Sequence, residues 1–211
     1  GATAGKSLLK TVSFGYDGYS KKDSILAIPV AATGDTSGVD RPLQIGLGET
    51  TTAKEGVHFS FLTSPAIRAG RAIDTVYLKI NRTEDMATTQ FEIDFVLQEN
   101  EFFSTRLGDS TGNYLHYRVL LDDIASTSYL WVTYSNVKAV INFFGEYSRK
   151  KVALMIEVLG VDAELFYDPA NTSHFSSARI VAYARYMAFW LNRESAEGRI
   201  YLDQHGDQIT M

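Results

Sequence analysis

The first half of the chain alternates apolar and polar residues over short segments. In "FEIDFV", Phe91, Ile93 and Phe95 point to one face of an extended strand, and Glu92 and Asp94 point to the other. Further segments alternate in this way or form continuous apolar runs, over residues 7–16, 24–32, 41–48, 72–80 and 113–121. Turn-forming sequences such as "YDGYSKKD", "TGDTSGVD" and "LGDSTGN" separate these segments. Six or seven strands at this spacing predict an antiparallel β-sandwich.

The period changes to that of helices in the last third of the chain. Ser148 is placed to cap a helix that Gly160 ends, and its apolar stripe follows the spacing i, i+3, i+4, i+7: Val152, Met155, Ile156 and Leu159. A second helix is predicted over residues 177–196, with Gly198 beyond its end and a core stripe of Ile180, Ala184, Met187 and Leu191. The final "RIYLDQHGDQITM" predicts a β-hairpin around residues 204–206.

These patterns predict the α+β class and two domains. Residues 1–122 are expected to form the antiparallel β-sandwich, and residues 123–211 a smaller helix-rich domain that ends in the hairpin.

The stretch "TTAKEGVHF", residues 51–59, interrupts the strand pattern and contains no recognisable chemistry. Gly56 supplies a backbone conformation that other residues resist, and the threonines can bond to nearby backbone. We expect Val57 and Phe59 to enter the sheet on one face, with His58 on the opposite face. The stretch is therefore interpreted as a structural joint, and the alternative is a binding role at the loop end.

Composition narrows the function classes. The 211 residues are 45% hydrophobic and contain 20 Lys and Arg against 25 Asp and Glu, a net charge of -5, which argues against nucleic acid as a partner. The absence of cysteine excludes disulfides, thiolate zinc sites and a cysteine nucleophile within these residues. No apolar run reaches the roughly 18 residues that cross a bilayer.

Two polar motifs invite a catalytic interpretation. "SRKK", residues 148–151, fits the Ser-x-x-Lys pattern of acyl enzymes, but the companion motifs are absent, so a helix cap followed by solvated basic residues is the preferred interpretation. The four histidines lack metal-binding spacing and are expected to be structural: His58, His116, His174 and His205. No catalytic residue is assigned.

Carboxylates leave two further hypotheses open. Asp35, Asp40, Asp122 and Asp123 could gather around calcium, although the regular alternation of a calcium loop is missing and turn chemistry explains these residues as well. We therefore predict no metal and no cofactor. Asp122, Asp123 or Glu146 could instead serve a hydrolase that acts on carbohydrate with two facing carboxyl groups.

Aromatic residues are the candidate binding groups. Tyr183, Tyr186 and Trp190 form a stripe beside the core stripe of the last predicted helix, and Trp131 lies between the two halves of the chain with Tyr129 and Tyr134. Packing in the core is one interpretation. The other is an exposed surface of Trp131, Tyr183, Tyr186 and Trp190 that stacks on sugar rings or contacts a protein.

The chain also resembles known families. "TTAKEGVHFSF", "PAIRAG" and "VYLKINRTED" resemble the immunoglobulin-like sandwich of Calx-beta domains, although His58 stands where that loop has an aspartate. "DRPLQIGL", "TTAKEGVHF", "AGRAIDTVYLKINRTEDM", "WVTYSNVKAVINFFGEYSRKKVALMIEVLG" and "LDQHGDQIT" resemble an uncharacterised family of Bacteroidetes surface lipoproteins, domain of unknown function 4843. The block "FFGEYSRKK" is the most specific of these motifs.

The second resemblance implies export and a lipid anchor on a cysteine upstream of Gly1, at the outer membrane or cell surface, in the company of nutrient-import systems. It implies no established activity and no catalytic residues. The expected function is a non-enzymatic accessory protein that binds a glycan, a peptide or an outer-membrane transport protein. The alternatives are the carboxylate hydrolase and a structural spacer or surface-assembly subunit.

Overall fold

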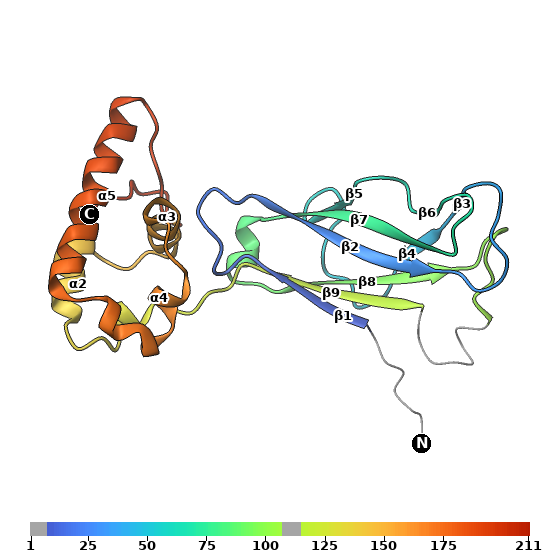
Figure 1. Cartoon of the computed structure of the whole chain (residues 1–211), viewed down its shortest axis with the longest axis horizontal. Helices are drawn as coiled ribbons and strands as arrows, with labels where there is room; N and C mark the ends of the chain where they lie inside the picture. Colours follow the sequence, from blue (N-terminus) through green and yellow to red (C-terminus); the bar gives the residue numbers. More distant parts are fainter. Residues whose placement is uncertain (1–7, 107–114) are drawn as a thin grey trace, which may run out of the picture. The chain divides into compact units, whose positions relative to one another are not determined.

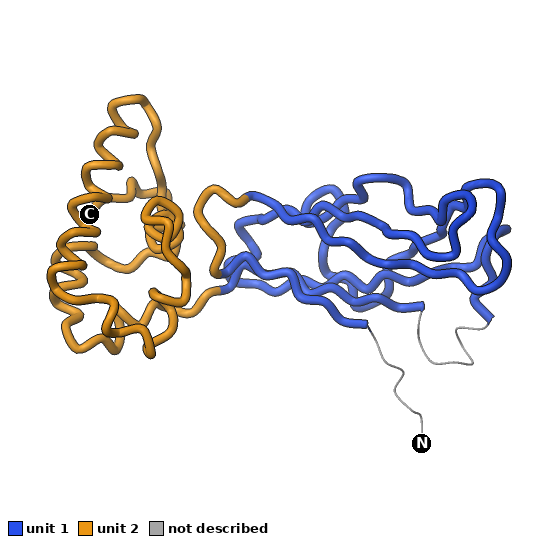
Figure 2. Tube along the Cα trace, in the orientation of Figure 1, with its two compact units in different colours: residues 1–15, 22–124 blue, residues 16–21, 125–211 orange. Residues whose placement is uncertain are grey.

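A computed structural model describes residues 8–106 and 115–211 (Figure 1). The chain forms two compact units (Figure 2): residues 1–15 with 22–124, and residues 16–21 with 125–211. The division after residue 124 lies two residues beyond the boundary expected from the sequence. Residues 16–21 leave the first unit and join the second, where Tyr19 packs against the core and its hydroxyl donates to the carbonyl of Leu202 at 3.1 Å.

The first unit is a β-sandwich, as the strand pattern predicts. One sheet has the strand order β1-β9-β8-β4 and contains β1 (Leu8–Ser13), β4 (Gln44–Leu47), β8 (Phe91–Gln98) and β9 (His116–Asp122). The second has the order β2-β7-β5 and contains β2 (Asp23–Ala31), β5 (Phe59–Phe61) and β7 (Ile73–Asn81). A short pair joins β3 (Arg41–Pro42) to β6 (Ala66–Ile67). Strand pairing is antiparallel except between β1 and β9, which run parallel.

The core of the sandwich lies between these two sheets. Leu78 and Ile80 of β7 and Phe59 of β5 pack in one cluster with Ile93 of β8 and Leu121 of β9, and all five are fully buried. Alternation places them inward because successive strand residues face opposite sides of a sheet. The 3-10 helix η1 (Glu84–Ala87) adds the buried Met86 to this cluster.

The outer face of β8 is less solvated than the sequence indicates. Glu92 is only partly exposed and Asp94 is buried, because partners on β9 cover them. Arg118 donates to Glu92 through Nε at 2.6 Å and Nη2 at 2.8 Å, and His116 Nδ1 lies 2.9 Å from Asp94. These diagonal cross-strand pairs hold β8 and β9 together, and the hydrogen bond from Arg118 lowers the pKa of Glu92.

The joint at residues 51–59 forms, but its faces differ from the prediction. Val57 is exposed and His58 is 1% exposed, because residues 56–58 belong to a turn and the strand begins at Phe59. The Lys54 backbone N–H donates to His58 Nδ1 at 2.8 Å, and the ring of His58 stacks on Phe91. Strand alternation therefore does not apply to Val57 and His58.

The second unit is built mainly from α2 (Val137–Phe144), α3 (Arg149–Leu159) and α5 (Ser177–Ala196). Shorter elements connect them: the 3-10 helices η2 (Tyr129–Trp131) and η3 (Pro169–His174), and α4 (Glu164–Tyr167). The bounds of α5 match the prediction, and Ile180, Ala184 and Met187 are buried. Ser148 caps α3 by accepting the Lys151 N–H at 3.2 Å, and Gly160 ends it with φ 63°.

This unit differs from the sequence prediction in one helix and in the size of the terminal hairpin. Helix α2, capped by Asn136, is absent from the predicted elements. The terminal hairpin is present in minimal form, with one antiparallel bridge between Leu202 and Gln208 around the turn at Gly206.

In the first unit, the predicted turn "LGDSTGN" lies outside the described residues.

Candidate functional site

Trp131 lies in the core of the second unit rather than on a surface. Its side chain packs beside Phe144 and Tyr147, and the indole N–H donates to the carbonyl of Gly145 at 2.9 Å. Only 9% of the residue is exposed. Its neighbour Tyr129 is also buried, and burial raises the pKa of Tyr129 to about 12.

Tyr183 and Trp190 are half-buried along one side of α5. The hydroxyl of Tyr183 lies 2.9 Å from Nε2 of His174, and the Trp190 ring contacts Tyr201 with 4.9 Å between centroids. Burial lowers the pKa of His174, assisted by the nearby charge of Arg179. These contacts use the two aromatic rings to attach η3 and the terminal turn to α5.

Tyr186 is the exposed member of the predicted aromatic set. It is 49% exposed, and Phe189, one turn further along α5, is 65% exposed. The four predicted residues therefore do not form one exposed surface, because Trp131, Tyr183 and Trp190 are turned toward the core or other side chains. A binding role for Tyr186 stays a prediction.

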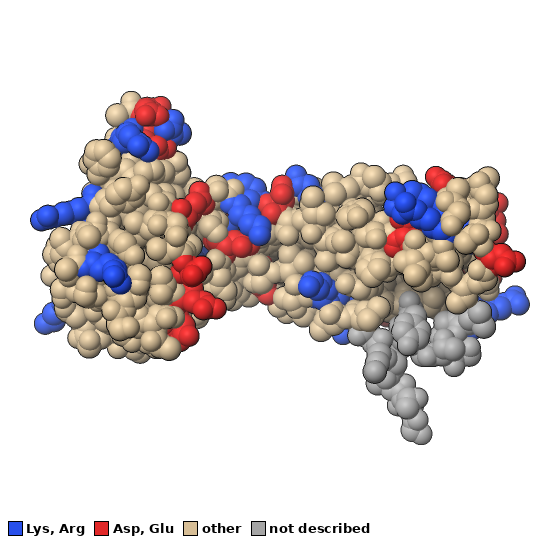
Figure 3. All heavy atoms as spheres, viewed as in Figure 1, with Lys and Arg blue, Asp and Glu red and all other residues tan. Residues whose placement is uncertain are grey.

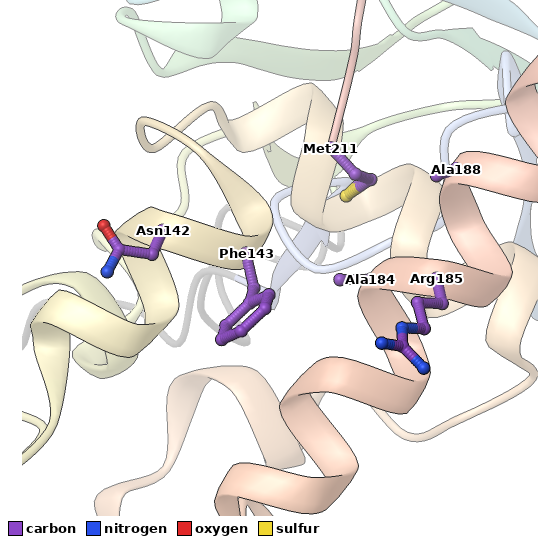
Figure 4. Close-up of a pocket in the computed structure, with 6 residues that line it drawn as sticks. All are labelled: Asn142, Phe143, Ala184, Arg185, Ala188 and Met211. Atoms are coloured by element: carbon purple, nitrogen blue, oxygen red, sulfur yellow. The ribbon is translucent and has the colours of Figure 1, made fainter.

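A shallow apolar groove lies between α2 and α5 in the same unit (Figure 4). It has a volume of about 210 Å³ and is lined by Phe143, Ala184, Ala188 and Met211, with Asn142 and Arg185 at its rim. The large apolar side chain of Phe143 is 40% exposed. The groove exists because Ala184 and Ala188 are small and leave the Phe143 ring uncovered.

The charges near this groove are sparse. Arg185 is exposed and has no ion pair with any described residue. On the face shown in Figure 3, neither unit presents a broad basic surface. The groove therefore combines apolar walls with one guanidinium group that can bind a carboxylate or carbonyl.

The Ser-x-x-Lys motif is structural, and one part of its interpretation was wrong. The Ser148 hydroxyl donates to Gln204 Oε1 at 2.8 Å, while Lys151 Nζ donates to the carbonyls of Phe144 and Glu146 at 2.7 and 3.1 Å. Lys151 is buried rather than solvated, and burial lowers its pKa. It binds carbonyls at the end of α2, where helix carbonyls lack partners.

Two of the three carboxylates of the hydrolase hypothesis, Asp122 and Asp123, are bound by neighbouring side chains. Asp123 accepts two hydrogen bonds from Arg82 at 2.9 Å, and Asp122 accepts from Ser13 and Gln90. Both aspartates are buried within the first unit, and Glu146 belongs to the second. Such pairing favours structural roles for Asp122 and Asp123.

Among residues 8–106 and 115–211, no group of three or more His, Asp or Glu side chains is placed to hold a metal ion. Asp40, a member of the calcium hypothesis, accepts the backbone N–H of Ala69 instead. None of the described helices has both the length and the apolar character needed to cross a membrane.

Comparison with known proteins relates most of the chain to one family. Residues 7–161 match the model of the family described as "Domain of unknown function (DUF4843)". No curated protein matches the chain.

Similar solved structures each cover little more than half of this chain. EndoBT-3987 of Bacteroides thetaiotamicron, solved with a Man5GlcNAc product, is 8% identical with a TM-score of 0.39 over 54% of this chain and 28% of its own. CBD12 from CALX1.2 is 12% identical with a TM-score of 0.36, over 57% and 44% of the two chains. A protein of unknown function from Bacteroides ovatus is 13% identical with a TM-score of 0.39, over 57% and 42%. The chain thus spans less than half the length of each.

Proposed function

Because the chain belongs to the family of the domain of unknown function DUF4843, which carries no assigned activity, we propose a function from its surface. We propose that the protein is a non-enzymatic accessory module of the cell surface that binds a component of an outer-membrane nutrient-import system. The groove between α2 and α5 is the observation that carries this proposal.

The groove has the properties of a docking site for a protein segment. An exposed phenylalanine, Phe143, lies beside two alanines in a hollow large enough for one apolar side chain. Arg185 at the rim, without an ion-pair partner among the described residues, supplies a donor for an acidic or carbonyl group next to that side chain. The partner segment is therefore expected to carry an apolar anchor with a neighbouring acidic residue.

Capture of outer-membrane proteins on the immobilised chain tests this proposal. Ala188→Glu fills the groove and places a carboxylate next to Arg185, and Phe143→Ser removes the apolar wall. Ala178→Glu is the matched control, because it adds the same charge to an exposed position two turns away from Arg185 on α5. The immobilised chains are incubated with detergent-solubilised outer-membrane proteins from the source bacterium. The wild type and the control should both retain a partner protein.

Ala188→Glu and Phe143→Ser should each lose that partner, while their circular dichroism spectra stay the same as that of the wild type. Retention of the same partner by both groove variants, or no retained protein on the wild type, would overturn the assignment of the groove. The proposed export and lipid anchor are tested separately by fatty-acid labelling of the full-length precursor. A precursor that stays in the cell interior and incorporates no fatty-acid label would contradict the proposed export and anchor.

A further inference from the structure

A second hollow, with different chemistry, lies in the first unit. Its volume is about 310 Å³, at the lower end of the roughly 300–1,000 Å³ of small-molecule pockets. It is bounded by Asp40, residues 63–66, Arg68 and residues 75–77. Its lining combines apolar side chains such as Pro65 and Val76 with polar ones and the aromatic ring of Tyr77.

Arg68 is held rigidly at this pocket. Its Nε donates to Asp74 Oδ2 at 2.7 Å, and its Nη2 donates to Asp74 Oδ1. The buried Asp74 carboxylate also accepts the backbone N–H groups of Arg68 and Thr75 at 2.9 and 2.8 Å. The Arg68 side chain is nevertheless 53% exposed, and its Nη1 group has no partner among the described residues. A donor is therefore fixed in place before any ligand arrives.

Asp40, which also lines the pocket, is held by a hydrogen bond from the backbone. Asp40 Oδ1 accepts the Ala69 N–H at 2.8 Å, and the carbonyl of Ser37 accepts the Gly70 N–H at 2.7 Å. Ala66, which pairs with Pro42 where β6 meets β3, also lines the pocket. Asp40 Oδ2 has no partner among the described residues, so one carboxylate oxygen stays available as an acceptor.

The remaining walls supply a ring and hydroxyl groups. Tyr77 is 42% exposed on the outer side of β7, next to the pocket. The hydroxyls of Thr63, Ser64 and Tyr77 form no hydrogen bond with the described residues. The pocket thus offers one aromatic face together with separate donors and acceptors.

The charge balance selects the kind of ligand. Asp74 already neutralises Arg68, Arg71 Nη1 lies 3.5 Å from the same carboxylate, and Asp40 lines the same pocket. Two carboxylates against two guanidinium groups favour neither an anion nor a cation. A hydroxyl group can donate to Asp40 and accept from Arg68 without net charge, and the C–H face of a sugar ring fits against Tyr77.

We propose that this pocket of the sandwich unit binds a neutral saccharide, with Tyr77 against the sugar ring and Asp40 and Arg68 bound to its hydroxyls. The inference adds a ligand class to the proposed accessory function. It uses other residues in the other unit, so loss of the groove function leaves it standing, and the reverse also holds.

Saturation-transfer NMR and isothermal titration on the whole chain test the proposal. The probes are neutral oligosaccharides of mannose, glucose, galactose and N-acetylglucosamine, a sialylated oligosaccharide, and an acidic peptide. At least one neutral saccharide should bind with a dissociation constant between micromolar and millimolar. The sialylated oligosaccharide should bind no more tightly than its neutral counterpart.

Substitutions in the pocket distinguish the contribution of the Tyr77 ring to binding from that of the polar groups. Tyr77→Ala and Asp40→Asn should each weaken binding about tenfold, the effect expected when one well-placed contact is lost. Tyr77→Phe keeps the ring and should retain most of the affinity. Ile73→Ala is the matched control, because Ile73 is 66% exposed on the same side of β7 and does not line the pocket. Asparagine at position 40 can still accept the Ala69 N–H, so Asp40→Asn should leave the fold intact.

Three results would overturn the proposal. One is no binding of any neutral saccharide in the set. Another is tighter binding of the sialylated oligosaccharide or the acidic peptide than of every neutral saccharide. The last is saccharide binding that is unchanged in Tyr77→Ala and Asp40→Asn while thermal unfolding matches the wild type.

Discussion

Replacing Gly56 by valine isolates the backbone strain in the joint between β4 and β5. Gly56 has φ +80°, and a side chain built on it meets no atom within 4 Å. The cost of Gly56→Val is therefore conformational rather than steric, because left-handed backbone costs residues with a Cβ about 1–2 kcal/mol, and a branched side chain lies at the upper end.

Gly38 provides a matched control in the same unit. A side chain built there also meets no atom within 4 Å, but its φ lies outside the left-handed region. Removing glycine restricts the unfolded chain and stabilises a protein by about 0.4–1 kcal/mol where the backbone is compatible. Gly38→Val should gain that amount, whereas Gly56→Val should lose about 1 kcal/mol net, so the two variants should differ by about 2 kcal/mol.

Chemical denaturation followed by far-UV circular dichroism measures this difference. Tryptophan fluorescence is unsuitable here, because both tryptophans lie in the second unit and report on that unit. Gly56→Asn should recover much of the stability, because asparagine tolerates positive φ better than valine. Equal unfolding free energies for Gly56→Val and Gly38→Val would refute the assignment of strain to Gly56. Loss of saccharide or partner binding at full stability would assign the joint a binding role instead.

Two further predictions concern the second unit. Ser148→Ala removes the hydroxyl that accepts the Lys151 N–H and donates to Gln204, so unfolding monitored by tryptophan fluorescence should be easier by about 1 kcal/mol, and an unchanged midpoint would contradict the capping role. The pKa of Glu194 is held at about 2, below its ordinary value of 4.5, chiefly by the hydrogen bond from Arg199. The stabilising contribution of Glu194 is therefore complete above pH 4.5 and is lost as the pH falls from 4.5 toward 2. When the unfolding midpoint is measured over this pH range, it should fall less in Glu194→Gln than in the wild type.

Strong periodic patterns predicted the elements that they describe. The 20 residues of α5 carry an apolar stripe over five turns, and the predicted bounds agree with the structure. Helix α2 was missed although Val137, Val140, Ile141 and Phe144 have the same helical spacing and Asn136 caps it. Its eight residues are rich in β-branched and aromatic side chains, which favour strands in isolation, and packing of Val140 and Phe144 into the core overrides that preference.

The candidate sites depended more on tertiary structure than the helices did. The sequence placed Tyr183, Tyr186 and Trp190 on one stripe of α5, but only the fold brings His174 and Tyr201 over Tyr183 and Trp190 and leaves Tyr186 exposed. The groove near Phe143 was missed because α2 was missed. The sandwich pocket was missed because Asp40, Arg68 and Tyr77 come from separate segments and belong to no local motif.

Local patterns in the sequence were enough to predict the fold class, the sandwich in the first half, the helices α3 and α5 with the cap residues Ser148 and Gly160, and the family resemblance. These depend on local periodicity and on residues such as Ser148 and Gly160, whose effect acts within one or two turns. The tertiary structure alone decided that residues 16–21 join the second unit, that Lys151 is buried, and that Asp40, Arg68 and Tyr77 share a pocket. Burial and convergence depend on contacts between residues distant in the chain, and the local pattern does not contain those contacts.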